Sequence, residues 1–208
     1  MKERIRKNIE LGVLFGLICA ITLSFARFEV RCDELRENIL RLHIVANSDT
    51  EADQTLKLAV RDKILENTST LFEDCTDLIS AQAAAQDNLD LIADTAQQVI
   101  DENGLSYSAK VSVGDAYFNT REYDDFTLPA GTYRSLIVTL GEGKGKNWWC
   151  VVFPAVCLPA AADEASLTDS VSKSSAKVAE NPQKYVMKFK TVEIYEGIKQ
   201  HFARNNKK

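Results

Sequence analysis

The chain has 208 residues, of which 45% are hydrophobic, and this is enough for one domain with a substantial core. Its formal charge of −5 is unevenly spread. Residues 1–26 hold four basic and two acidic side chains, which leaves 21 basic and 28 acidic ones, a charge of −7, on residues 27–208. An acidic body argues against nucleic-acid binding, because that function needs basic surface to neutralise phosphates.

The N-terminus carries a targeting pattern. A basic start precedes the almost wholly apolar stretch Leu11–Ala26. A helix of this length spans about 24 Å, less than the roughly 30 Å of a bilayer core. Ser24-Phe25-Ala26 places small residues at the two positions that a signal peptidase reads. We predict that residues 1–26 form either a cleaved signal peptide or an uncleaved membrane anchor, with residues 27–208 as a single exported domain.

Four cysteines lie in the exported part, and export makes disulfides possible. Pro154, between Cys150 and Cys157, can turn the chain so that these two thiols meet. The alternatives for this pair are a disulfide or two small apolar core residues. Cys32 and Cys75 can pair or stay free. No CxxC occurs and the two histidines are far apart, so no metal or other cofactor is predicted.

The most specific local pattern follows. Leu40–Ala46 alternates in polarity with period two, which predicts a strand. Residues 47–49 (Asn-Ser-Asp) favour a turn. Ser48 and Glu51 have the spacing of a capping box, so a helix should start there and run to Leu65 with apolar positions on two sides. A strand should therefore feed a helix through a tight polar turn.

The remaining chain alternates between helical and strand patterns. Residues 27–38 predict a short helix or tether, residues 77–103 a long helix, and residues 191–203 a final helix. Strands are expected at Ser106–Val113, Ala116–Tyr123, Thr132–Leu140, Trp148–Phe153 and Tyr185–Lys190. Trp148 and Trp149 should point to opposite faces of their strand. Residues 160–183 have the composition of a mobile loop, with or without a helical turn.

These elements predict an α+β fold. We expect a mostly antiparallel sheet of about five to six strands, packed by two long helices and a C-terminal helix, after the N-terminal apolar segment. The C-terminal end, Lys184–Lys208, has seven basic residues against Glu193 and Glu196. It is either a solvated helix end, where cations suit the helix dipole, or a contact for lipid headgroups or an acidic partner.

Familiar catalytic motifs are absent from the sequence. There is no GxSxG and no HExxH, and the glycine-rich residues 141–146 lack the spacing of a phosphate loop, which favours a solvated hairpin tip. His43 with Asp49 is the one base-and-orienter pair to consider, for an envelope-associated hydrolase. A strand histidine without an evident nucleophile is more often structural.

Three separated blocks resemble the stage II sporulation protein R family. They are residues 42–49 with 53–62, residues 128–136 around Leu-Pro-Ala-Gly, and residues 147–157 around Asn-Trp-Trp-Cys. Their order and spacing cover about residues 1–158 and resume at 189–201, whereas residues 160–183 do not align.

The resemblance implies an intercellular signalling protein of sporulation, made in the forespore and exported into the intermembrane space. Members activate a membrane-embedded aspartic protease of the mother cell, which then processes a pro-sigma factor. The chain would be a ligand rather than an enzyme, without a small-molecule substrate. The predicted partner-binding strip is His43, Asn47, Asp49, Asp53, Gln54, Lys57 and Arg61. The plain alternative is that residues 47–49 only cap a helix and that Lys57 and Arg61 are solvated.

Overall fold

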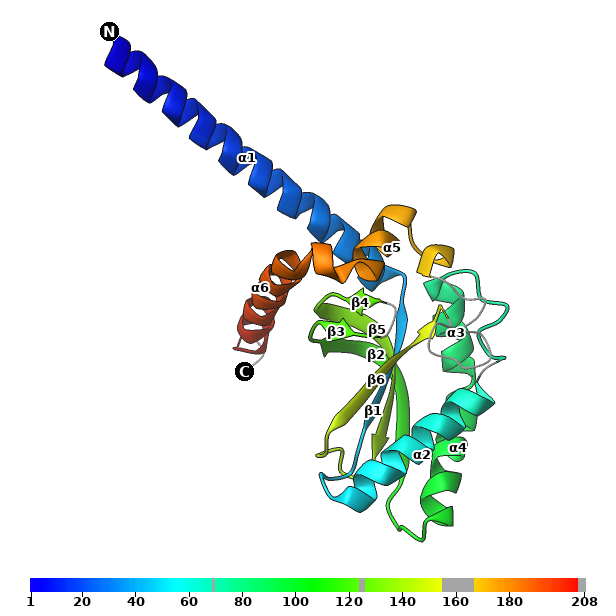
Figure 1. The fold of residues 1–208 in the computed structure, drawn as a ribbon. Coiled ribbons are helices and arrows are strands. Elements are labelled where there is room, and N and C mark those ends of the chain that lie inside the picture. Colours follow the sequence, from blue (N-terminus) through cyan, green and yellow to red (C-terminus); the bar gives the residue numbers. More distant parts are fainter. Residues whose placement is uncertain (69, 124–125, 155–166, 206–208) are drawn as a thin grey trace.

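The computed structural model describes residues 1–208 except 69, 124–125, 155–166 and 206–208. Figure 1 shows a long helix, α1 (Lys2–Glu37), that projects from one end of a body built from a sheet and helices. The predicted α+β class is confirmed. We call the end of the body beside α1 the proximal end and the opposite end of the sheet the distal end.

A four-stranded sheet forms the centre of the body, in the order β2-β5-β1-β6. The strands are β1 (Leu40–Val45), β2 (Ala109–Phe118), β5 (Gly131–Leu140) and β6 (Asn147–Phe153). β1 pairs with β5 in parallel, while the β1–β6 and β2–β5 pairs are antiparallel. A separate two-stranded ribbon joins β3 (Arg121–Glu122) to β4 (Thr127–Leu128). The mostly antiparallel prediction holds, but the main sheet has four strands rather than five to six.

Two strand predictions are wrong. Residues 106–113 and 116–123 were expected as separate strands. One continuous ten-residue strand, β2, instead runs from the first range into the start of the second and pairs along its whole length with β5, while Arg121–Glu122 form β3. Residues 185–190 were expected as a strand, but α6 (Val186–Asn205) begins there. Tyr185, Met187 and Phe189 alternate with period two, but Tyr185, Phe189 and Val192 have helical spacing, and these three pack with Phe28 of α1. Tertiary packing decides between the two periods.

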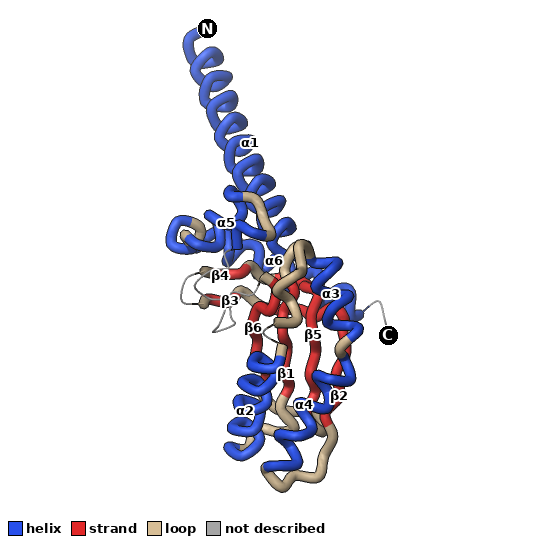
Figure 2. Tube along the Cα trace, turned by 90° about the vertical axis from the view of Figure 1, so that its right-hand side faces the viewer, coloured by secondary structure: helices blue, strands red, loops and turns tan. Residues whose placement is uncertain are grey.

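Three helices cover one face of the sheet, as Figure 2 shows: α2 (Glu51–Asn67), α3 (Leu78–Asp87) and α4 (Leu89–Glu102). Leu42 and Ile44 of β1 pack there against Val60 and Ile64 of α2 in the main hydrophobic cluster. Each such side chain contributes about 1.5–3 kcal/mol when fully buried. The single helix predicted over residues 77–103 is two helices, divided at Asn88, whose side chain binds the Ala84 carbonyl at 2.8 Å.

The other face of the sheet is covered at its proximal end. There the end of α1 packs with the ribbon, with the 3₁₀ turn η1 (Leu167–Asp169) and with α5 (Lys173–Glu180), around Leu35, Phe118 and Tyr133. A second 3₁₀ turn, η2 (Pro182–Lys184), leads into α6. The expected loop at residues 160–183 therefore contains a helix, capped by the Ser172 side chain, while residues 160–166 lie outside the described part of the chain.

α1 has two different halves. An 18-residue window of it has a mean hydropathy of 2.2, and none of that window is buried, so α1 is long and apolar enough to cross a membrane. A signal sequence has the same properties. Towards its C-terminal end Phe28, Cys32, Leu35 and Arg36 are buried in the body. The predicted tether at residues 27–38 is thus the anchored end of the same helix.

Candidate functional site

The turn between β1 and α2 is built around the carboxylate of Asp53. Thr50, not the predicted Ser48, caps α2, because its hydroxyl accepts from the Asp53 backbone N–H at 3.3 Å. The Ser48 hydroxyl instead donates to the Asp53 carboxylate, which also accepts from the Asn47 amide at 3.0 Å and the Tyr107 hydroxyl at 2.7 Å. Asp53 is buried, so its role in the predicted strip is to hold the turn in place.

The electrostatics of this turn favour an ionised Asp53. Burial by itself raises the pKa of the carboxyl, but the hydrogen bonds from Ser48, Tyr107 and Asn47 outweigh it and hold the pKa below its ordinary value. The buried charge is therefore stabilised by donors rather than by an ion pair.

The glycine-rich loop between β5 and β6 docks onto the same turn. Asn47 accepts from the backbone N–H of Glu142 at 3.0 Å, and Asp49 accepts from that of Lys146 at 2.7 Å. A Cβ at Gly145 would overlap the Ser48 carbonyl oxygen, so glycine is required for this approach. The loop exposes its charged side chains, but it is held to the turn rather than free. We call this contact between residues 47–49 and 141–146 the distal lock.

Two further strip residues take part in the distal lock. Lys57 donates to the Gln54 side chain at 2.7 Å and to the Lys146 carbonyl at 3.2 Å, and Gln54 donates to the Ser48 carbonyl at 2.8 Å. Lys57 is buried, and burial lowers the pKa of its ammonium although the nearby Asp49 charge opposes that effect. Lys57 is therefore not the solvated cation of the plain alternative.

Arg61 ends the strip and is partly exposed. Its guanidinium lies 5.1 Å from the ring centroid of Trp148 and pairs with Asp62. Trp148 packs on the main cluster below the helices, whereas Trp149 packs on the cluster of the other sheet face. The two tryptophans thus point to opposite faces, as predicted.

His43 lies on the face of β1 that points away from the helices. Its Nε2 is 3.0 Å from the Asn147 side-chain oxygen, and its ring stacks on Trp149 at 6.1 Å between centroids. Burial lowers the pKa of this imidazole, against the effect of the Asn147 hydrogen bond, so it is neutral at neutral pH. Asp49 binds the Lys146 backbone instead. His43 and Asp49 thus take different partners, and their hydrogen bonds do not couple them as base and orienter.

Arg41 was missed by sequence reasoning. It is fully buried beside His43, with its guanidinium 3.8 Å from the ring centroid of Phe118 and a 2.6 Å hydrogen bond to the Tyr123 hydroxyl. Two of its nitrogens, Nε and Nη1, have no hydrogen-bond partner in the described part of the chain. Burial lowers its pKa. A charged residue in the middle of an alternating strand was the available clue, because such a position is either solvent-facing or specially stabilised.

At the proximal end, Arg36 joins α1 to the turn before β5. Its guanidinium donates twice to the Ala130 carbonyl, at 3.0 and 2.8 Å, and pairs with Glu29 and Asp33. Gly131 has a φ of +149°, and a Cβ there would overlap the Arg36 side chain. We call this contact the proximal lock. The proximal lock explains two residues of the Leu-Pro-Ala-Gly block: the Ala130 carbonyl accepts from Arg36, and Gly131 leaves room for the Arg36 side chain.

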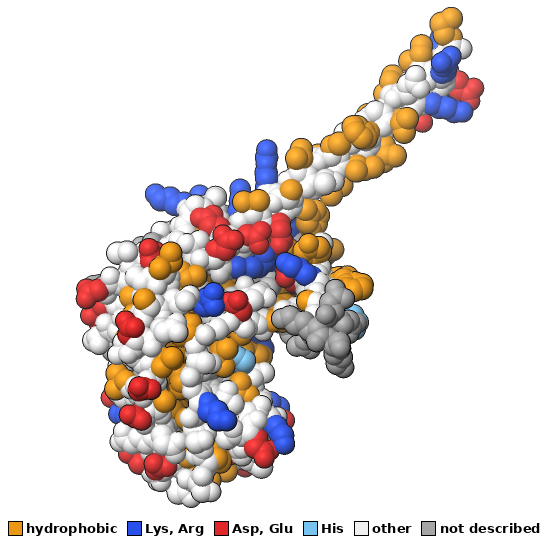
Figure 3. All heavy atoms as spheres, turned by 180° about the vertical axis from the view of Figure 1, so that it is seen from behind, with side chains coloured by type: hydrophobic (Ala, Val, Ile, Leu, Met, Phe, Trp, Pro, Cys, Tyr) orange, Lys and Arg blue, Asp and Glu red, His pale blue; other side chains and the backbone are white. Residues whose placement is uncertain are grey.

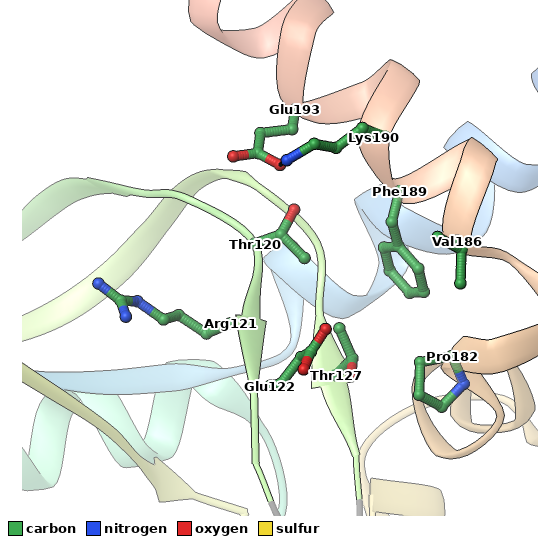
Figure 4. Close-up of a pocket in the computed structure, with 9 residues that line it drawn as sticks. All are labelled: Thr120, Arg121, Glu122, Thr127, Pro182, Val186, Phe189, Lys190 and Glu193. Carbon is green, nitrogen blue, oxygen red and sulfur yellow. Dashed lines mark hydrogen bonds and ion pairs between the residues drawn. The ribbon is translucent and has the colours of Figure 1, made fainter.

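A hollow of about 500 Å³ separates the ribbon from α6 (Figure 4). Lys190 and Glu193 on its rim pair with each other at 3.2 Å. Arg121 points away from the hollow in Figure 4, and its guanidinium covers Trp149 at 3.7 Å. The residues that line it therefore do not converge on a common ligand. Within the described residues, no group of three or more histidine, cysteine or acidic side chains could hold a metal ion.

The cysteines take different states. Cys150 is disulfide-bonded, while its predicted partner, Cys157, lies outside the described residues. Cys32 and Cys75 are free thiols. Burial raises the pKa of Cys32 to about 12, so it stays protonated in the core.

Comparisons with known proteins agree with the resemblance. The family model described as stage II sporulation protein R (spore_II_R) matches residues 36–163. The stage II sporulation protein R of Bacillus subtilis (strain 168) is 32% identical over 141 residues, which cover 68% of this chain and 63% of that relative. No solved structure matches the chain. The matched residues begin at Arg36 of the proximal lock and include the whole of the distal lock, and on this evidence the chain belongs to the stage II sporulation protein R family.

Proposed function

We propose that this protein is an intercellular signal of sporulation that activates a membrane-embedded aspartic protease of the mother cell. Activation then triggers processing of a pro-sigma factor. Membership of the stage II sporulation protein R family is the observation that carries this proposal. The apolar N-terminal helix supports export from the forespore into the intermembrane space, with the helix either cleaved off as a signal peptide or kept as a membrane anchor.

The residues of the predicted contact strip differ in how far solvent reaches them. Asp53 and Lys57 are buried and hold the distal lock together. Asp49 is exposed, and Arg61 keeps part of its side chain in solvent. His43, Asn47 and Gln54 are half-buried. Contact with the protease would therefore use Asp49, Gln54 and Arg61 on a surface whose shape is set by the buried pair.

Activation requires a difference in affinity. A ligand shifts a protease towards its active arrangement only if it binds that arrangement more tightly than the inactive one. Aspartic proteases use two carboxylates that share one site. A ligand that stabilises the assembly of both halves would therefore activate the enzyme without taking part in the chemistry.

The test is co-expression with the protease and its sigma precursor in a non-sporulating host. Arg61→Glu reverses the accessible charge of the strip and should reduce precursor cleavage strongly. Lys63→Glu is the matched control, because Lys63 lies on the same helix and pairs only with Glu66 among the described residues. Both variants should fold as the parent does by circular dichroism. Normal cleavage with Arg61→Glu would remove Arg61 from the contact, and no cleavage with the parent chain would remove the function.

A further inference from the structure

α6 carries an apolar stripe that no described residue covers. Met187, Ile194, Tyr195, Ile198 and Phe202 are all exposed, from 53% for Ile198 to 77% for Met187. Their spacing of four, seven and eight residues places them on one face of the helix. The opposite face, with Phe189 and Val192, packs against α1. α6 is therefore apolar both towards the body and away from it.

The charges of α6 are sorted around this stripe. At 100° per residue, Lys188 and Lys199 fall about 70–90° to one side of the stripe centre and Lys190 about 90° to the other. Glu193 and Glu196 fall about 150° away, on the side of the body. Glu196 is in fact buried. An apolar stripe flanked by lysines is the pattern of a helix at a membrane surface, where lysine stems reach up to the headgroups. Lys190 and Lys199 pair with Glu193 and Glu196 at 3.2 Å, but their side chains are 71% and 64% exposed, so that headgroup phosphates can still reach both ammonium groups.

The stripe lies where α1 leaves the body. Lys188 donates to the Ser24 hydroxyl at 2.7 Å and to its carbonyl at 3.3 Å. Phe25 and Ala26 of α1 share an apolar groove with Thr191 and Tyr195 of α6. Figure 1 shows that α6 runs across the direction of α1. Figure 3 shows hydrophobic side chains along α1 and again beside the point where α1 meets the body. When α1 enters a bilayer, α6 is thus brought to the surface of the same bilayer.

We propose that α6 lies in the surface of the membrane that α1 enters, with its apolar stripe among the acyl chains and its flanking lysines on anionic phospholipid headgroups. This inference does not depend on the protease. It gives the basic C-terminal segment a ligand, an anionic lipid surface, and it holds the body at the membrane by two elements instead of one. The distal lock, at the other end of the sheet, then faces away from that membrane.

The test places a fluorescent reporter on the stripe of the full chain. Ile198→Trp and, as a matched control, Ile79→Trp are each reconstituted by α1 into anionic vesicles with and without lipids brominated on their acyl chains. Ile79 is 80% exposed on α3, away from α1. Bromine quenches only tryptophans that reach the acyl region, about 5–10 Å below the headgroups for a surface helix. Trp148 and Trp149 contribute the same background to both chains.

We expect brominated lipid to quench the emission of the Ile198→Trp chain and to leave that of the Ile79→Trp chain unchanged. Replacing the anionic lipid by a zwitterionic one, or adding Lys190→Gln with Lys199→Gln, should reduce the quenching. Equal quenching of the two chains would overturn the proposal. So would a blue shift of the Ile198→Trp emission that depends on protein concentration in detergent without lipid, because a second copy of the chain would then cover the stripe.

Discussion

Each end of the body has a contact that holds a turn in place, but the two contacts use different groups. The distal lock joins two loops through polar side chains and backbone amides, and its carboxylates bind donors within the chain. The proximal lock joins a helix to a turn through one guanidinium, next to apolar surface that is left exposed on α6. The distal end is therefore a polar surface whose carboxylates have partners within the chain, whereas the proximal end leaves an apolar surface exposed. Variants of each lock can test this contrast.

The largest effect is expected at the distal lock. Gly145→Ala places a methyl group against the Ser48 carbonyl, and backbone has little freedom to move away. We expect a loss of roughly 3 kcal/mol in the free energy of unfolding, measured by urea titration in mild detergent. Gly197→Ala is the control, since nothing lies within 4 Å of its Cβ position and alanine suits a helix better. Equal stabilities of the two variants would show that the loop is not docked.

The proximal lock should give the next effect. Arg36→Met removes both hydrogen bonds to the Ala130 carbonyl and two ion pairs. Hydrogen bonds that involve a charged group contribute about 1.5–3 kcal/mol, so we expect a loss of roughly 2 kcal/mol in the same titration. Arg31→Met, on the same helix but partly exposed, serves as the comparison. A larger loss for Arg31→Met would place the junction of α1 with the body elsewhere.

The smallest effect concerns pH. The pKa of Asp53 is lower in the fold than in the unfolded chain, so its contribution is fully present above the unfolded value of about 4 and is lost as the pH falls through the folded value. Asp53→Asn should cost about 1–1.5 kcal/mol at pH 7. It should also flatten the decline in the free energy of unfolding below about pH 4.

Asp94→Asn, on the exposed side of α4, is the control for this pH series and should keep the slope of the parent chain. If Asp53→Asn keeps that slope as well, the carboxylate is not ionised by its donors in the way the geometry indicates.

Local patterns predicted the centre of the fold well. The strand expected at residues 40–46 is β1 at 40–45, and the helix expected from Glu51 to Leu65 is α2 at 51–67. These elements follow from periodicity and polar turn residues that act over a few positions. The cap moved from Ser48 to Thr50 because the Ser48 hydroxyl binds Asp53 instead.

Long-range contacts account for most of what the sequence could not predict. The docking of residues 141–146 onto Asn47 and Asp49 joins positions about a hundred residues apart, and no local pattern encodes it. Likewise Lys57 looked solvated because one of its two acceptors, the Lys146 carbonyl, becomes its neighbour only after the loop has docked, whereas Gln54 is three residues away on the same helix. The helical spacing of the predicted strip was correct. Asp53 and Lys57 were expected to face solvent, but both are buried.

The continuity of α1 has a mechanical consequence. No glycine or proline occurs from Phe25 to Glu37, and one uninterrupted helix runs from the apolar half into the buried half. If α1 is retained, it is a rigid helix rather than a flexible tether. Any tilt or rotation of the helix within the bilayer then turns the whole body with it. The direction in which the distal surface faces would then be set by the tilt and rotation of α1 in the lipid.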